Sequence, residues 1–178
     1  MNEFDDHLTP AMTSRTRESR FRIVWVILVP LAAILFQVYL PRFMETLSYL
    51  ELPLLTTVYF ALMRRQPVAG GLIGASIGLV QDALSQHPLG LFGIVKTLVG
   101  YFSASVSQRF DVQNHGLRFI LSFFFFVFHQ FFFWLLSRAL LGYTIDFNAS
   151  QTMIFAFLNA VVAVPLFVVL DKLKEEGR

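Results

Sequence analysis

The stretch LRFILSFFFFVFHQFFFWLLSRALL, residues 117–141, decides the fold class of this chain. A helix needs about 20 mostly apolar residues to cross the hydrocarbon core of a bilayer, and this run is longer than that. Its apolar residues follow one another without the period-two alternation that marks a strand of a membrane barrel. The run therefore predicts a membrane-spanning α-helix.

The composition of the whole chain agrees with a membrane protein. Of the 178 residues, 56% are hydrophobic and only 15% are charged, whereas roughly 25% are charged in soluble proteins. The 21 phenylalanines must be buried or face lipid, because a small soluble fold exposes few contiguous apolar patches. The chain has no cysteine and only four scattered histidines, so we expect neither a disulfide nor a metal site nor any other cofactor.

Similar apolar runs occur along the rest of the chain and predict six spans in total. The further runs are residues 23–40, 47–63, 68–84, 89–108 and 152–170. The run 68–84 is short and rich in glycine, so a re-entrant segment is a competing interpretation there. We expect an all-α polytopic membrane protein with one membrane domain over residues 23–171. A disordered basic arm at residues 1–22 precedes it, and a cytoplasmic tail at residues 172–178 follows.

The positions of the basic residues predict the orientation of these spans. In a chain with six spans, 11 of the 14 Lys and Arg residues fall on the side of the two termini. The other side receives Arg42 and Arg138, and Lys96 lies inside a span. The positive-inside rule then places both termini in the cytoplasm. Basic residues beside membrane helices suit anionic lipid as a partner, and nothing in them suggests nucleic acid.

Three ionisable residues remain at membrane depth: Glu51, Asp82 and Lys96. Such residues cost several kcal/mol unless they are paired or wetted, so each is a candidate functional residue. All three fall in the outer half of the bilayer, and we expect Lys96 to pair with Asp82, with Glu51 as a second candidate partner. A structural ion pair that locks helix packing and a site for a substrate or a proton are both open.

Glycine spacing predicts a close helix contact in the third span. Gly70, Gly74 and Gly78 form two overlapping G-x-x-x-G units on one face. Small residues at this spacing let two helix backbones approach closely in a membrane. The pattern predicts a packing or partner face, and it leaves open whether the neighbouring helix belongs to this chain or to another.

Residues 74–78 also match the G-x-S-x-G pattern of serine hydrolases. Ser76 would be the nucleophile, and His129 is the histidine that falls inside a span. The hydrolase pattern requires a strand-to-helix turn, whereas this one lies in a small-residue helix. Interhelical hydrogen bonding is therefore the expected role of His129, as it is for Asn159 in the sixth span.

Residues 68–101 carry an ordered set of small and polar residues. These are Gly71, Gly74, Gly78, Asp82, Leu89, Gly90, Gly100 and Tyr101. The set resembles the rod shape-determining protein family MreD, in which a glycine-rich third helix ends in an aspartate. In that family a short loop with Leu-Gly follows, and the fourth helix ends in a Gly-Tyr-like pair. The close match covers about a fifth of the chain.

This resemblance implies a non-enzymatic membrane component of the bacterial cell-elongation machinery, located in the inner membrane. The implied partners are membrane lipid, an MreC-like protein and, directly or indirectly, MreB, RodA and a class B penicillin-binding protein. The family is also thought to be similar to the six-helix substrate-binding subunits of energy-coupling-factor transporters. A small-molecule-binding subunit of a transporter, with its ligand near Glu51, Asp82 and Lys96, is therefore the alternative function.

Overall fold

The computed structural model describes residues 23–39, 49–85, 88, 90–143 and 146–173. Within them the chain forms six helices and no strand, which confirms the all-α class. The helices are α1 (Ile23–Tyr39), α2 (Leu52–Arg64), α3 (Pro67–Leu84), α4 (Leu91–Ser107), α5 (His115–Leu141) and α6 (Ala149–Asp171). The predicted arm at residues 1–22, Leu89, and residues 174–178 of the predicted tail lie outside the described residues.

The helices differ in whether they could cross a membrane on their own. By length and composition α3, α5 and α6 are long and apolar enough. The other three helices of the described chain are apolar but shorter, with 17 residues in α1, 13 in α2 and 17 in α4. Helix α3 is continuous over its 18 residues.

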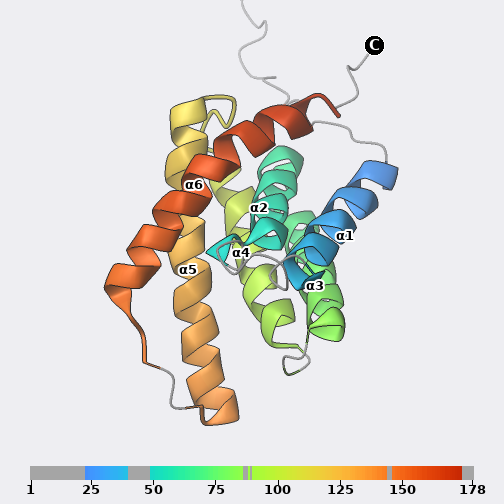
Figure 1. Ribbon diagram of the computed structural model, residues 1–178. Helices are drawn as coiled ribbons and strands as arrows, with labels where there is room; N and C mark the ends of the chain where they lie inside the picture. Colours follow the sequence, from blue (N-terminus) through green and yellow to red (C-terminus); the bar gives the residue numbers. More distant parts are fainter. Residues whose placement is uncertain (1–22, 40–48, 86–87, 89, 144–145, 174–178) are drawn as a thin grey trace, which may run out of the picture.

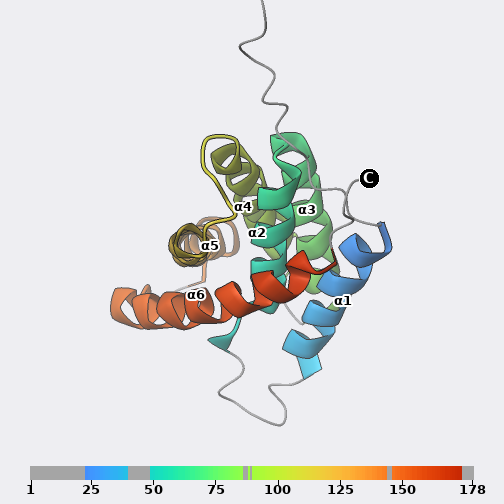
Figure 2. The same cartoon turned by 90° about the horizontal axis from the view of Figure 1, so that it is seen from above.

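Helix α2 is the centre of the bundle. Figure 2 shows it with the other five helices around it, and it contacts each of them. Residues 53–63 are all buried, so α2 offers no side chain from that stretch to lipid. A helix that is apolar and buried all round is typical of the core of a helical assembly.

The beginning of α2 differs from the span predicted at residues 47–63. The helix begins at Leu52, and Pro53 lies in its first turn. Proline is tolerated there because the first-turn N–H groups have no partner inside the helix. The predicted span included Tyr49 and Leu50 because they are apolar, but both residues precede the helix. A short non-helical segment therefore reaches into the bundle, which a membrane protein tolerates where the segment is surrounded by protein.

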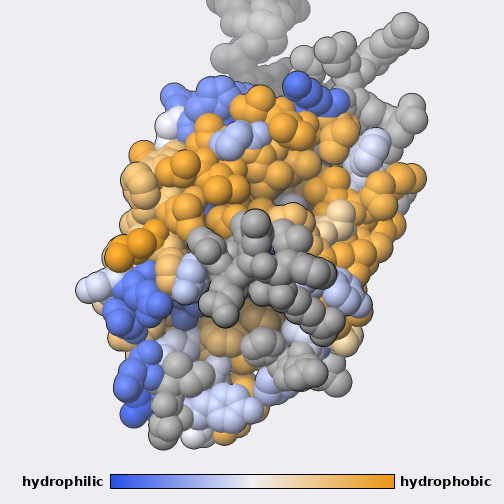
Figure 3. Space-filling model, in the orientation of Figure 1, coloured by the Kyte–Doolittle hydropathy of each residue, from blue (hydrophilic) through white to orange (hydrophobic). Residues whose placement is uncertain are grey.

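The helices alternate in direction through the bundle. In Figure 1 the end of α6 lies at the top, together with the starts of α1 and α5. Side-chain caps fix the starts of α5 and α6, because Asn114 and Asn148 accept hydrogen bonds from first-turn N–H groups. Figure 3 shows a broad apolar surface with hydrophilic residues toward the top and the lower left of the view.

Candidate functional site

A glycine seam joins α3 to α4. Its α3 side consists of Gly70, Gly74 and Gly78, which lie one above another on the same helix face. Opposite them are backbone carbonyl groups at successive turns of α4, those of Gly100, Lys96 and Phe92. A Cβ atom on any of the three α3 glycines would approach one of these carbonyl oxygens closer than 3.0 Å. The predicted packing face thus has its neighbour within this chain.

The buried carboxylate of Asp82 holds the start of α4. Asp82 ends the glycine-lined face of α3 and is 1% exposed. Its Oδ2 atom accepts hydrogen bonds from the N–H groups of Gly90 at 2.9 Å and Gly93 at 3.0 Å. Its Oδ1 atom accepts one from the N–H of Phe92 at 3.1 Å. A carboxylate at a helix N-terminus also interacts favourably with the helix dipole, so this charge is neutralised largely by backbone.

Lys96 lies in the middle of α4 with its whole side chain buried. Its Nζ atom is 3.4 Å from Nε2 of His129 and 4.4 Å from the centre of the Phe92 ring. Glu51 and Asp82 both attract its charge. Within the described residues, however, neither carboxylate comes within 4.0 Å of Nζ. The expected direct pair of Lys96 and Asp82 is therefore not formed, because the Asp82 oxygens bind backbone N–H groups instead.

Glu51 belongs to the segment just before α2, and two distant helices hold this segment. Asn159 of α6 accepts a hydrogen bond from the N–H of Glu51 at 2.8 Å and donates one to the carbonyl oxygen of Tyr49 at 2.8 Å. Gln37 of α1 accepts a hydrogen bond from the N–H of Leu52 at 3.1 Å. The fully buried Asn159 thus makes contacts between elements, as predicted from its place in an apolar run.

These residues together form what we call the polar layer, to which five helices and the N-cap residue of α2 contribute. It consists of Gln37, Glu51, Asp82, Lys96, His129 and Asn159. Each side chain in the layer either interacts with another member or forms a hydrogen bond to backbone next to a member. The three charged residues singled out from the sequence are therefore members of one layer. Of the other three members, His129 and Asn159 were expected to form interhelical hydrogen bonds, and Gln37 was not predicted. A lone amide in the apolar first span was the signal for it.

The structure separates the two residues of the hydrolase interpretation. Ser76 is exposed on α3 and donates its hydroxyl proton to the carbonyl oxygen of Leu72 at 2.9 Å. His129 is 1% exposed and packs against Lys96 and the Phe92 ring. A nucleophile and its base must lie within hydrogen-bond reach of each other. Ser76 and His129 form no such hydrogen bond. The described residues also contain no group of three or more His, Asp or Glu that could hold a metal ion.

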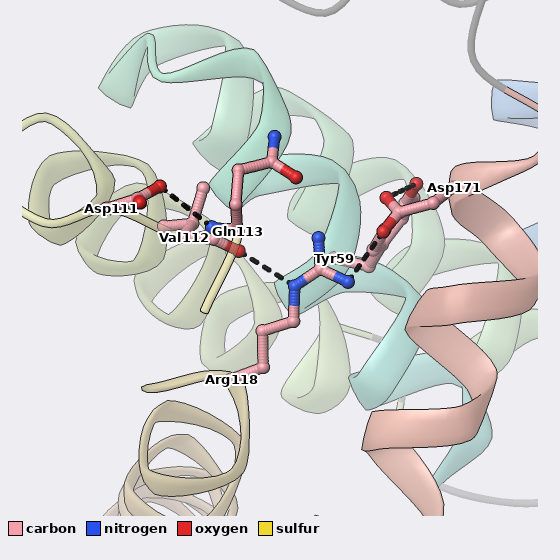
Figure 4. A network of polar contacts seen from close by, with 6 residues as sticks. All are labelled: Tyr59, Asp111, Val112, Gln113, Arg118 and Asp171. Atoms are coloured by element: carbon pink, nitrogen blue, oxygen red, sulfur yellow. Dashed lines mark hydrogen bonds and ion pairs between the residues drawn. The ribbon is translucent and has the colours of Figure 1, made fainter. Parts of the chain in front are cut away.

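A second polar site, the Arg118 site, was not predicted. Arg118 in the first turn of α5 is 0% exposed and donates from Nη1 to Oδ2 of Asp171 at 2.6 Å (Figure 4). Its Nε atom donates to the carbonyl oxygen of Val112 at 2.7 Å. The hydroxyl of Tyr59 donates to Oδ1 of Asp171 at 3.0 Å. The site joins α2, α5 and α6 at the end of the bundle that carries the C-terminus.

The sequence did contain a signal for the Arg118 site. Arg118 is the second residue of the fifth apolar run, and Asp171 follows the sixth run. The start of one helix and the end of the next lie at the same depth in an antiparallel pair, so opposite charges there can meet. From the sequence alone, Arg118 was only one of the basic residues that mark the orientation of the spans. Its burial shows that a basic residue at a helix start can also be a structural partner.

The remaining family-motif positions have separate structural roles. Gly90 is the N-cap residue of α4 and has a φ of +98°, a left-handed conformation that residues with a Cβ rarely adopt. Gly100 lies in the glycine seam, where a Cβ would collide with the backbone of Gly70. Tyr101 is exposed, and a Cβ at Gly71 would make only ordinary contacts.

Comparison with known proteins gives one match. The family model described as rod shape-determining protein MreD matches residues 19–175, nearly the whole chain. No curated protein and no solved structure gives a match. The family match confirms the resemblance seen at residues 68–101 and extends it over all six helices.

Proposed function

Because the chain belongs to the rod shape-determining protein MreD family, we propose that it is a non-enzymatic scaffold of the bacterial cell-elongation machinery. The family is associated with the MreB and MreC shape machinery. The proposed direct partner is an MreC-like protein. MreB, RodA and a class B penicillin-binding protein are bound directly or through it, and lipid surrounds the remaining surface.

The observation that best supports a scaffold is that the polar side chains of the layer lie inside the bundle. Asp82, Lys96 and His129 are buried against one another or the backbone inside the bundle. Large apolar side chains cover the outer faces of α1, α3, α5 and α6. Such a molecule offers other membrane proteins a rigid apolar surface and short loops. The alternative of a small-molecule-binding subunit would place a ligand near Glu51, Asp82 and Lys96, and of these residues Asp82 already accepts three backbone hydrogen bonds.

We also propose that the protein is a multi-pass protein of the inner membrane with six spans and both termini in the cytoplasm. The length of α2 is the main obstacle, since 13 residues extend only about 20 Å at 1.5 Å per residue. A hydrocarbon core is about 30 Å thick. The five surrounding helices remove α2 from lipid contact, so its short length exposes no backbone to the bilayer.

Depletion of the protein in a rod-shaped bacterium tests the proposed function. We expect depleted cells to become round and an MreC-like protein to co-purify with the tagged chain. Retention of rod shape, or failure of an MreC-like protein to co-purify under conditions that keep the bundle folded, would argue against the scaffold.

A matched variant separates the scaffold from the hydrolase interpretation. Ser76→Ala removes the hydroxyl of an exposed residue and leaves the glycine seam and the polar layer unchanged. We expect it to restore rod shape in depleted cells as well as the unchanged chain does. A round-cell phenotype from a correctly folded Ser76→Ala protein would instead favour a serine nucleophile.

A further inference from the structure

The ammonium group of Lys96 is buried without enough hydrogen bonds. It carries three donors, yet its one polar contact in the described chain is Nε2 of His129 at 3.4 Å. That distance exceeds the usual 2.7–3.2 Å for an N–H donor to its acceptor. The ring of Phe92 gives a further cation–π contact at 4.4 Å but accepts no conventional hydrogen bond. Lys96 therefore has unused donors inside the bundle.

Glu51 supplies the complementary group. Its Oε2 atom is buried and has no hydrogen-bond partner among the described residues. Lys96 attracts this carboxylate electrostatically, although their charged atoms stay more than 4.0 Å apart. Buried polar atoms in proteins almost always have a partner, so the unfilled donors and acceptor need an explanation. A buried water that links two to four polar atoms is the common one.

The surroundings of Glu51 provide a route for water. As a whole residue Glu51 is only half-buried, whereas Lys96 is completely buried. The polar layer is therefore partly exposed at Glu51 and enclosed at Lys96. The backbone at Tyr49 and Leu50 is not α-helical. Non-helical backbone at membrane depth occurs where it is enclosed by protein or lines a water-filled space. Both features favour access on the side where α2 begins.

We propose that water enters the polar layer beside Glu51 and that a water molecule bridges the Glu51 carboxylate and the Lys96 ammonium. The site is thus a hydrated point inside the bundle, reached from the outer side of the membrane. The assignment of the side rests on the proposed six-span topology, whereas the hydration rests only on the contacts of Glu51 and Lys96.

The absence of cysteine from the chain makes this site testable by single-cysteine chemistry. A thiol reacts with a methanethiosulfonate as its thiolate, which forms in water and is suppressed in apolar surroundings. The matched variants are Lys96→Cys and Val95→Cys, at adjacent positions of α4 that are both 0% exposed. In detergent we expect Lys96→Cys to react at least about tenfold faster. Equal rates in folded protein would overturn the proposed hydration.

Two further measurements separate folding and topology from hydration. The aminoethyl reagent forms a disulfide with the Sγ atom of the introduced cysteine, releases methanesulfinate and appends an ammonium group near the native one. It should raise the melting temperature of Lys96→Cys, whereas the sulfonatoethyl reagent should not.

If Lys96→Cys does not fold, Glu51→Cys is compared with Leu54→Cys, which is 0% exposed on α2. In sealed vesicles, modification only from the cytoplasmic side would overturn access from outside.

Discussion

Asp82 and Arg118 show how this protein accommodates single charges inside an apolar bundle. Each is almost completely buried, and each is neutralised by groups outside its own helix. Asp82 binds backbone N–H groups, and Arg118 binds a carboxylate and a backbone carbonyl. Removing one partner of such an interaction costs more than the interaction contributes, because the other partner stays buried.

The first prediction concerns Asp82→Ala. The substitution leaves the N–H groups of Gly90, Phe92 and Gly93 without their acceptors. We expect it to lower the free energy of unfolding by about 3 kcal/mol. Asp82→Asn keeps one acceptor oxygen and should cost less. Thermal melts or denaturant titrations in detergent measure both, and a fully stable Asp82→Ala protein would contradict the assigned capping role.

The second prediction concerns the pair of Arg118 and Asp171. Arg118→Met leaves the Asp171 carboxylate without its charged partner, and Asp171→Leu leaves the Arg118 guanidinium without its partner. Each single substitution should lower the free energy of unfolding by about 3–5 kcal/mol. The double variant should be more stable than either single variant, because it strands neither charge. A double-mutant cycle measures this recovery. Additive losses in the double variant would show that the 2.6 Å contact contributes little.

At this scale the sequence located buried charges better than it located their partners. Hydropathy was enough to single out Glu51, Asp82 and Lys96 at membrane depth. The partner of Asp82 was missed because backbone N–H groups carry no side-chain signature in the sequence. Arg118 was interpreted only as an orientation marker, because its burial depends on how α5 packs against α2 and α6.

At the scale of helices, the α3–α4 pair is the most extensively packed part of the bundle. Gly74 faces the carbonyl oxygen of Lys96, and Gly78 faces that of Phe92. Close backbone contact is an important source of attraction between helices in lipid, where the hydrophobic effect does not drive association. The seam therefore fixes the position of Lys96 as well as the pairing of the two helices.

The third prediction compares Gly74→Ala with Gly71→Ala. A Cβ at position 74 collides with backbone of α4, and such overpacking typically costs about 1–3 kcal/mol. A Cβ at position 71 meets only ordinary contacts, no closer than 3.7 Å. Alanine there should be neutral or stabilise the helix by up to about 1 kcal/mol. Melting temperatures of the two proteins test this contrast, and equal effects would contradict the close seam.

The helices themselves were largely predictable from the sequence, since long apolar runs bounded by polar or proline-rich breaks gave all six positions. The start of α2 was the main error. Hydropathy cannot distinguish an apolar residue inside an α-helix from one outside it, so Tyr49 and Leu50 were included in the span although α2 begins at Leu52. The hydrogen bonds that Asn159 and Gln37 accept at the start of α2 depend on where α6 and α1 lie, which local sequence does not report.

At the scale of the whole molecule, the fourth prediction tests the proposed orientation. Gln113 precedes α5 and Tyr143 follows it, and both residues are exposed. A membrane-impermeant thiol reagent should label Gln113→Cys only in inside-out vesicles and Tyr143→Cys only in right-side-out vesicles. Each variant serves as the control for the other. Labelling of both from the same side would show that α5 does not cross the bilayer.

The short, enclosed α2 has a consequence for how the protein is made. A segment leaving the ribosome must be stable in lipid by itself or wait for later segments. With 13 residues, α2 falls short of the roughly 20 needed to span alone. We expect a released chain truncated after Gln66 to leave α2 outside the bilayer, and one that extends through Gln108 to insert it beside α3 and α4. Protease protection of the two truncated chains in membranes would follow this order of assembly.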